Sequence, residues 1–233
     1  MRFDILSIFP EMFDSVFRES VIGRARAKGL IEIFSHNLRD YSQNKHKKVD
    51  DYPFGGGVGM VMSVEPISIA LDSLKKEGEP AFTVLMSPSG KRLDQKKARE
   101  LSEKKRIIVI CGRYEGVDER VALHYVDEEI SIGDYILSGG EIPAMALVDA
   151  VSRLIPGTLG DPRSSEEESF EQELLEYGQY TRPREFQGHK APDVLFSGNH
   201  REIREWQKRN ALEKTARQRP DLLENIETKK VEN

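Results

Sequence analysis

Apolar runs and amphipathic segments alternate over the first 160 residues of the chain. Short runs rich in isoleucine, valine, leucine and phenylalanine, which predict strands, cover residues 3–9, 30–34, 82–86, 106–110 and 128–132. Segments with apolar residues at helical spacing, which predict helices, cover residues 11–18, 21–28, 66–74, 95–104, 117–124 and 142–154. Strands that alternate with helices indicate an α/β domain with a largely parallel sheet. The last of these helices is apolar almost all round, which predicts a buried or interface helix.

The pattern changes at residue 161. Residues 161–168 read Asp-Pro-Arg-Ser-Ser-Glu-Glu-Glu, a polar, proline-containing and charged stretch that is typical of a mobile linker. The β-like pattern disappears beyond it, and residues 170–177, 198–218 and 221–227 predict helices. We therefore expect a first domain over residues 1–160, a flexible linker over 161–169 and a small helical domain over 170–233.

Composition narrows the class of protein. The chain has 233 residues and a formal net charge of −5, which does not suggest a general binder of polyanions. No apolar run approaches the ~20 residues that span a bilayer, so we expect no membrane association, and the N-terminus predicts a strand instead of a signal peptide. The one cysteine, Cys111, ends a predicted strand and is expected to be a buried structural thiol, which fits a reducing cytoplasm. The five histidines show no metal-ligand spacing, so we expect no zinc site.

Three consecutive predicted strands end in small or flexible loops, at residues 87–90, 112–116 and 131–141. Ligands of open α/β sheets bind outside the carboxyl ends of the strands. Each loop alone could be an ordinary strand-to-helix connection, because glycine-rich turns are common. Together they predict a pocket lined by backbone amides and carbonyls, which suits a ligand with many hydrogen-bonding atoms, such as a nucleoside.

The glycine-rich segment 55–59, Gly-Gly-Gly-Val-Gly, does not match a phosphate-binding fingerprint. It follows a polar loop instead of a strand and does not fit G-x-G-x-x-G, and the chain has no G-x-x-x-x-G-K-[ST]. A flexible loop and a substrate-contacting loop are equally good interpretations of this segment.

Long motifs follow one another over nearly the whole chain. They are Asp51 to Met60, Gly-Arg-Tyr-Glu-Gly-Val-Asp-Glu-Arg at 112–120, Ser-Ile-Gly-Asp-Tyr at 131–135, Leu-Ser-Gly-Gly-Glu at 137–141, Tyr-Thr-Arg-Pro at 180–183 and Leu-Phe-Ser-Gly-Asn-His at 195–200. In this collinear order they resemble the bacterial tRNA (guanine-N1)-methyltransferase family, TrmD. The resemblance implies a SPOUT-type α/β domain with a deep trefoil knot, an obligate homodimer with composite active sites, and S-adenosyl-L-methionine as methyl donor. It also implies that the substrate is guanosine 37 of tRNA, the nucleotide directly 3′ of the anticodon.

The resemblance assigns a cofactor pocket residue by residue, at the same strand ends that the loop pattern indicates. The residues that it implies are Leu85, Ser87, Pro88, Gly112, Tyr114, Glu115, Gly116, Ser131, Ile132, Gly133, Tyr135, Leu137, Gly139, Gly140 and Pro143.

Methylation of guanine N1 requires removal of the N1 proton, for which a carboxylate is a suitable general base. Negative charge then builds toward O6, where a positioned arginine can stabilise it. The resemblance places this arginine at Arg153 and the base at Glu168, where the family usually has an aspartate that is one methylene shorter. Without the resemblance, Glu168 would be the last charge of a solvated acidic run and Arg153 a snorkelling residue at a helix end.

Two segments are expected to contact RNA. One is the basic stretch 44–48 beside Asp50, and the other is the helix that includes residues 201–219, in which cations outnumber carboxylates. Arg201, Arg204 and Lys208 fall on one helical face that suits phosphates, although a solvated face is the usual alternative. Ile203 and Trp206 fall on another face and are expected in the core. The full set of predicted substrate contacts is Lys45, His46, Asp50, Gly57, Gly59, Asn199, His200, Arg201, Arg204 and Lys208.

Two other functions stay open at this point. One is an RNA-binding protein that keeps the fold without turnover, which the exchange at Glu168 suggests. The other is a methyltransferase of the same fold that acts on ribosomal RNA, against which the second-domain motifs argue. An Mg²⁺ requirement also stays open.

Overall fold

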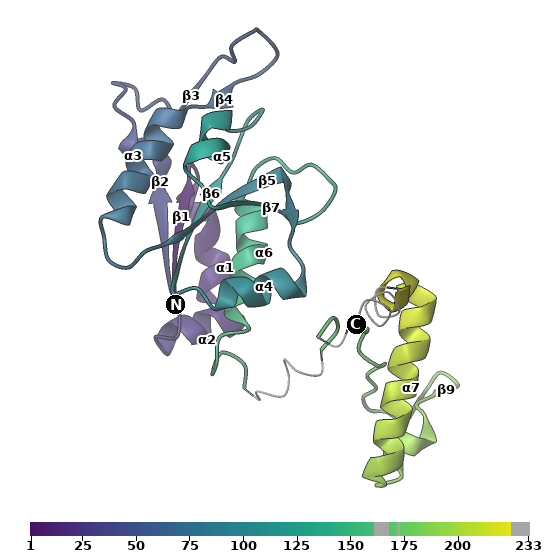
Figure 1. Ribbon diagram of the computed structural model, residues 1–233. Coiled ribbons are helices and arrows are strands. Elements are labelled where there is room, and N and C mark those ends of the chain that lie inside the picture. The colour runs from purple at the N-terminus through teal and green to yellow at the C-terminus, as the bar shows by residue number, and fades with distance from the viewer. Residues whose placement is uncertain (161–167, 172, 225–233) are drawn as a thin grey trace, which may run out of the picture. The chain divides into compact units, whose positions relative to one another are not determined.

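The computed structural model describes residues 1–160, 168–171 and 173–224 (Figure 1). The chain divides into two compact units, Met1–Gly160 and Asp161–Asn233. Most of the linker predicted at 161–169 lies outside the described residues, as do the last residues of the helix predicted at 221–227.

The first unit is built on a five-stranded sheet with the order β2-β1-β6-β5-β7. Every pair of neighbouring strands is parallel, which confirms the predicted sheet type. The strands are β1 (Arg2–Ser7), β2 (Glu32–Asn37), β5 (Phe82–Arg92), β6 (Arg106–Cys111) and β7 (Glu128–Ser131). A separate two-stranded sheet joins β3 (Asp50–Asp51) to β4 (Val61–Met62).

Helices cover both faces of this sheet (Figure 1). One face packs on η1 (Pro10–Phe13), α1 (Asp14–Arg18), α2 (Ser20–Ala27), α4 (Gln95–Ser102) and α6 (Glu141–Ser152). The other face packs on η2 (Leu38–Tyr41), α3 (Val64–Lys75) and α5 (Glu119–His124). Side chains of the central strand β6 alternate between the two cores, with Ile107 and Val109 on one side and Ile108 and Ile110 on the other.

Several boundaries differ from the sequence-based prediction. Glu19 has an extended backbone that separates α1 from α2, and β2 begins at Glu32 and not at residue 30. Strand β5 continues past Met86 with an irregular register, so that both Met86 and Lys91 pair with Ile130. The predicted loop 87–90 is therefore an excursion within this strand. A Cβ on Gly90 would lie 2.4 Å from the backbone nitrogen of Ile130, which explains the glycine there.

A buried ion cluster joins the strands at one end of the sheet. Asp4 in β1 is 0% exposed and accepts hydrogen bonds from Arg2, from Nε of Arg106 at 2.8 Å and from Nε2 of His36 at 2.9 Å. Burial by itself raises the pKa of Asp4, but these hydrogen bonds and the charge of Arg106 outweigh it and lower the pKa to about 2. The carboxylate therefore stays ionised and holds β1, β2 and β6 together.

The second unit contains one long helix, α7 (His200–Gln218), as predicted, and residues 220–224 are also helical. The helix predicted at 170–177 is wrong, because the described residues of that range form turns, bends and a stretch without regular secondary structure. Side chains of α7 accept hydrogen bonds from backbone N–H groups of this stretch and of the residue after it. Leu175 N donates to Thr215 Oγ1 at 2.9 Å and Gly178 N to Asn210 Oδ1 at 2.8 Å. A hairpin of β8 (Glu185–Phe186) and β9 (His189–Lys190) and the turn η4 (Asp193–Phe196) complete the unit.

Candidate cofactor pocket and catalytic residues

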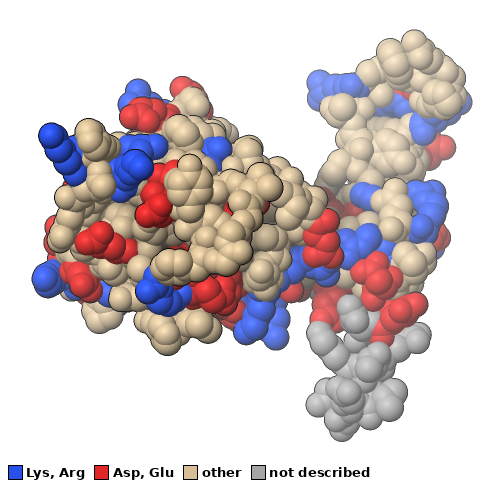
Figure 2. All heavy atoms as spheres, turned by 90° about the horizontal axis from the view of Figure 1, so that it is seen from above, with Lys and Arg blue, Asp and Glu red and all other residues tan. Residues whose placement is uncertain are grey.

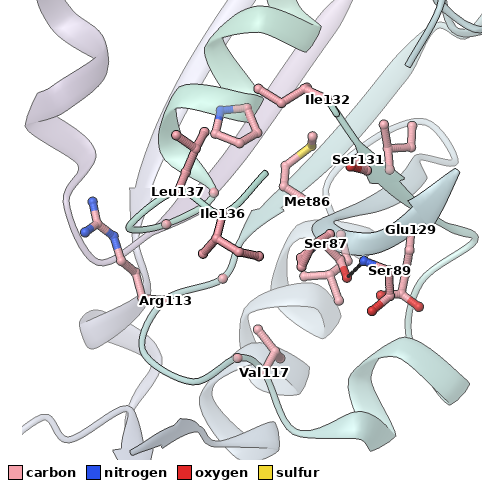
Figure 3. A pocket seen from close by; sticks show the side chains of 18 of the residues that line it. Met86, Ser87, Ser89, Arg113, Val117, Glu129, Ser131, Ile132, Ile136 and Leu137 are labelled. Carbon is pink, nitrogen blue, oxygen red and sulfur yellow. Dashed lines mark hydrogen bonds between the residues drawn. The ribbon is translucent and has the colours of Figure 1, made fainter. Parts of the chain in front are cut away.

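A cavity of about 450 Å³ opens in the first unit at the carboxyl ends of β6 and β7 and at the irregular middle part of β5 (Figure 3). Segments 85–89, 112–117, 129–133 and 135–140 line it, together with the start of α6. All the residues that the sequence assigns to a cofactor pocket, from Leu85 to Pro143, are in this lining. The three strand-end loops therefore meet, as the pattern of the sequence predicts.

The loop after β6 and the loop before α6 cross at Gly140, where their backbones are in contact. Gly140 N donates to Gly112 O at 2.8 Å, and Arg113 forms a β-bridge with Gly139. A Cβ on Gly140 would lie 2.7 Å from Cα of Cys111 and 2.9 Å from N of Gly112. Its φ of −80° suits any residue, so the requirement for glycine here is purely steric. The deep trefoil knot that the resemblance implies stays a prediction.

Apolar groups stay exposed at the cavity. Ile136, which Figure 3 labels, is 81% exposed and lines it. Tyr135 is 56% exposed and is also in the lining. Tyr114 is also exposed and has a φ of +63°, a conformation uncommon for a residue with a side chain. These groups form a surface that a bound ligand would cover.

Polar side chains of the cavity come from serines and carboxylates. Ser131 Oγ donates to Gly133 O at 3.0 Å, which fixes the start of its loop, and Ser89 N donates to Ser87 Oγ at 3.2 Å. Glu115 and Glu129 add carboxylates to the lining. The sequence-based prediction missed several lining residues, some of which lie within strands or helices and some at other positions of the motifs themselves: Met86, Ser89, Arg113, Val117, Glu119, Ala122, Glu129, Ile130, Ile136 and Ser138.

Arg113 connects the cavity lining to α6 and β1 through hydrogen bonds of Glu141. Its Nε donates to Oε2 of Glu141, which is 1% exposed in the first turn of α6, and Oε1 of Glu141 accepts from Oγ of Ser7 at 2.7 Å. The guanidinium lies 4.7 Å from the centroid of the Phe9 ring, directed away from the centre of the cavity (Figure 3). Arg113 is therefore a structural link in this geometry.

Cys111 lies directly before this loop and is fully buried. Burial raises the pKa of its thiol well above the usual value, and the nearby Glu141 carboxylate adds to this rise. A thiol held in its neutral form is a poor nucleophile, so the structure agrees with a structural role.

The glycine-rich loop reaches the rim of the cavity. A Cβ on Gly59 would lie 2.5 Å from Oε1 of Glu115, and Glu115 N donates to Met60 O at 3.0 Å. Gly57 lies in the same loop, and Asp50 pairs with Met62 in the small β3–β4 sheet. Lys45 and His46 are exposed in a turn before it and do not line the cavity.

Neither of the two predicted catalytic residues is part of this cavity lining. Arg153 caps the carboxyl end of α6, where its N donates to Asp149 O at 3.1 Å. The amino end of the same helix lines the cavity, and its 12 residues span roughly 18 Å. Glu168 belongs to the second unit and is half-buried, and its carbonyl accepts from Glu171 N at 3.4 Å.

Comparison with known proteins decides the family. A family model described as tRNA (Guanine-1)-methyltransferase TrmD matches residues 1–225. The chain belongs to the TrmD family. The resemblance found in the motifs is thereby confirmed, and so is the SPOUT-type α/β fold class.

Relatives from several bacteria match over nearly their whole length. The tRNA (guanine-N(1)-)-methyltransferase of Dictyoglomus turgidum is 59% identical over 224 residues, which cover 96% of this chain and 90% of that protein. The protein of the same name from Moorella thermoacetica is 55% identical over 228 residues, covering 97% and 91%. The crystal structure of tRNA (m1G37) methyltransferase from Aquifex aeolicus aligns with a TM-score of 0.79 at 43% identity, covering 97% of this chain and 95% of that one.

The second unit of this TrmD chain holds the remaining predicted RNA contacts. Asn199 caps α7, where its Oδ1 accepts from the backbone nitrogens of Arg201 and Glu202. Arg201 also pairs with Glu205 at 3.0 Å. His200, Arg204 and Lys208 are exposed on the same helix. As predicted, Trp206 packs within the unit, with ring centroids 6.4 Å from Tyr177 and 6.2 Å from Tyr180.

Charge is mixed on the face of the chain that Figure 2 shows. On the face shown in Figure 2, basic and acidic side chains are interspersed over both units, in line with the modest net charge of −5. Within the described ranges, no three histidine, cysteine or acidic side chains gather into a metal-binding group. None of the described helices has the length and apolarity needed to cross a membrane.

Proposed function

We propose that this chain transfers the methyl group of S-adenosyl-L-methionine to N1 of guanosine 37 of tRNA, in the cytoplasm. The observation that carries the proposal is the meeting of all the predicted cofactor residues in one cavity, in a chain of the TrmD family. Its relatives are named for methyl transfer to guanine N1 of tRNA.

The cavity fits S-adenosyl-L-methionine in size and chemistry. Its volume of about 450 Å³ lies within the ~300–1,000 Å³ typical of small-molecule pockets. Apolar side chains such as Leu85 and Ile132 can contact the adenine ring, while Glu129 and the serine hydroxyls can bind polar atoms of the ribose and amino acid. When bound, S-adenosyl-L-methionine supplies an electrophilic methyl group. Backbone contacts around Gly140 hold the cavity in shape before the ligand arrives.

We assign the proton transfer to Glu168 and charge stabilisation to Arg153. A carboxylate within hydrogen-bond reach of guanine N1 accepts its proton as the methyl group arrives. The guanidinium of Arg153 stabilises the negative charge that builds toward O6. Mg²⁺ is a variable of the assay and not a part of the assignment.

We further propose that two copies of the chain form the active site together. Arg153 and the cavity lie at opposite ends of α6, roughly 18 Å apart along the helix. In a homodimer, Arg153 of the partner subunit can supply the arginine at the cavity of the other subunit, so that the two need not be close within one chain. Exposed apolar side chains of the first unit are available for such an interface, since Phe9, Val16 and Ile142 are 41%, 44% and 51% exposed.

Mixing two inactive variants tests the composite site. In a 1:1 mixture of Arg153→Ala and Gly140→Ala chains, a heterodimer has one intact site, so methyl transfer should return. Each variant by itself should be inactive. If one chain supplied the whole active site, the mixture would be inactive as well. Sedimentation as a monomer at micromolar concentration would contradict the dimer as well.

Identification of the product tests the whole proposal. Unmodified tRNA transcript is incubated with the protein and labelled S-adenosyl-L-methionine, then digested to nucleosides. We expect 1-methylguanosine as the labelled nucleoside. Label in another nucleoside would refute the assigned chemistry. If ribosomal RNA incubated in the same way takes up label while the tRNA transcript takes up none, the assigned substrate is refuted.

A further inference from the structure

The hairpin of the second unit has a defined geometry. Strands β8 and β9 pair with the register Glu185 to Lys190 and Phe186 to His189. Gln187 and Gly188 connect them with φ values of +51° and +84°, the left-handed pair that a two-residue type I′ turn requires. Ala191 N donates to Arg184 O at 2.9 Å and extends the pairing by one step.

This register separates the hairpin's side chains onto two faces, because directly opposed residues share a face and neighbours along a strand alternate. One face carries Glu185 with Lys190, which form an ion pair at 3.6 Å. The other face carries Phe186 and His189, with Arg184 two residues earlier on the same side. The only carboxylate of the hairpin, Glu185, thus lies on the opposite face from Phe186.

The face of Phe186 is open to solvent. Phe186 is 61% exposed, and all residues from 181 to 190 are exposed. The guanidinium carbon of Arg184 lies 4.1 Å from the centroid of the Phe196 ring. A guanidinium that lies over a ring face directs its N–H groups outward in its own plane, where they can bind an anion.

We propose that Arg184, Phe186 and His189 form an RNA contact in which the Phe186 ring stacks on an unpaired base of tRNA. Exposed aromatic rings are the usual stacking partners of unpaired bases in loops. Arg184 binds a backbone phosphate beside that base, since a guanidinium matches phosphate geometry. The guanidinium of Arg184 on this face and the absence of a hairpin carboxylate there favour RNA over an acidic protein. This inference rests on the proposed function and assigns a substrate contact that the sequence-based set does not contain.

Binding of an unmodified tRNA transcript to the full chain tests the contact. Loss of one base–aromatic stack costs 1–3 kcal/mol, so Phe186→Ala should raise the Kd for tRNA about 5- to 150-fold. Phe186→Tyr keeps the ring and should bind as the unchanged chain does. Phe186→Leu keeps apolar area without a ring and should lose affinity as the alanine variant does.

The salt dependence of tRNA binding separates the phosphate contact of Arg184 from the base stacking of Phe186. Arg184→Gln should reduce the slope of log Kd against log salt by about 1, because one phosphate contact is lost. Phe186→Ala should leave that slope unchanged. Leu123→Ala is the matched control, since Leu123 is an aliphatic residue that is 65% exposed on α5 in the first unit. It should leave tRNA affinity unchanged, and S-adenosyl-L-methionine binding should be equal in all five variants.

The outcomes distinguish the two proposals. If the unchanged chain binds and methylates tRNA but Phe186→Ala binds equally well, the inference is overturned and the proposed function stands. If Phe186→Leu binds as the unchanged chain does, the contact is not a stack and the inference is wrong. If the unchanged chain neither binds nor methylates tRNA, the proposed function fails first and the inference falls with it.

Discussion

Glu141 and Arg113 form an ion pair at the base of the cavity, with 2.9 Å between Oε2 of Glu141 and Nε of Arg113. Glu141 is 1% exposed and also accepts from Ser7 Oγ at 2.7 Å. The pair joins the end of β1, the loop after β6 and the first turn of α6. Three segments that are distant in sequence therefore depend on one buried carboxylate for their relative positions.

Glu141→Gln should destabilise the chain and weaken cofactor binding. The amide keeps the size of the side chain but removes a charged acceptor, and hydrogen bonds to charged groups contribute about 1.5–3 kcal/mol. We expect the free energy of unfolding in urea to fall by about 2 kcal/mol and the Kd for S-adenosyl-L-methionine to rise. Glu65→Gln is the control, because Glu65 is an exposed glutamate in the first turn of α3 and should cost only ~0.3–1 kcal/mol. Equal losses in the two variants would mean that the ion pair has no special role.

Gly140→Ala should remove the stabilisation that the cofactor provides. The new Cβ would lie 2.7 Å from Cys111 Cα, so the backbone crossing that shapes the cavity must open. Ligand at 100 times its Kd adds about 2.7 kcal/mol to the stability of the unchanged chain, which a thermal shift measures. Gly160→Ala should keep that shift, because nothing lies within 4 Å of a Cβ at Gly160. An unchanged shift in Gly140→Ala would refute the placement of the cofactor.

Acid should destabilise the chain through Asp4. Its pKa is lowered from 3.8 to about 2 in the folded state, so the unfolded chain binds this proton more tightly. The stabilisation is complete above the unfolded pKa and is lost as pH falls through about 2. It amounts to about 2 kcal/mol.

Asp4→Asn tests that link. At neutral pH the variant leaves Arg106 buried without its charged partner and should cost about 3–5 kcal/mol. The difference in unfolding free energy between the unchanged chain and this variant should shrink as pH falls from 4 to 2. Asp14→Asn removes an exposed ion pair with Arg18 and should cost about 0.3–0.5 kcal/mol. A difference that is constant with pH would contradict the assigned pKa.

The parts of the structure that follow from local patterns could be predicted from the sequence. Continuous apolar runs identify the buried strands, and the small residues after them identify the cavity edge, because parallel strands place their carboxyl ends together. The role of Glu141 could not be predicted, since its partners Ser7 and Arg113 come from distant segments. The cluster around Asp4 is equally non-local, because Arg2, His36 and Arg106 lie on three different strands.

The second unit shows where periodicity misleads. Residues 170–177 have apolar positions that suit a helix, but side chains of α7 such as Thr215 and Asn210 take the backbone hydrogen bonds of the stretch that follows. The two strands of the hairpin are too short to show an alternating pattern. Gln187-Gly188 is also a weaker turn signal than Asn-Gly. The pattern of the sequence therefore does not single out Phe186.

Glu168→Gln should slow methyl transfer without weakening cofactor binding. It keeps size and hydrogen bonding but removes the proton acceptor, and loss of a general base typically costs 10²–10⁴-fold in rate. Glu168→Asp should retain activity, because it restores the residue that the family usually has. Single-turnover methyl transfer measures the chemical step.

Glu167→Gln is the control for the acidic run, and its position lies outside the described residues. A merely solvated run would respond alike at positions 167 and 168. Equal and small effects of the two variants would show that Glu168 is not the base. Asp50 or Glu115 would then become the next candidate.

The central claim is methyl transfer to one nucleotide of tRNA. The most direct test compares two transcripts of one tRNA that differ only in guanosine or adenosine directly 3′ of the anticodon, with labelled S-adenosyl-L-methionine and with Mg²⁺ present or absent. We predict that the guanosine transcript takes up label as 1-methylguanosine at that position and that the adenosine transcript takes up none. Equal labelling of both transcripts, or labelling of neither, would contradict the account.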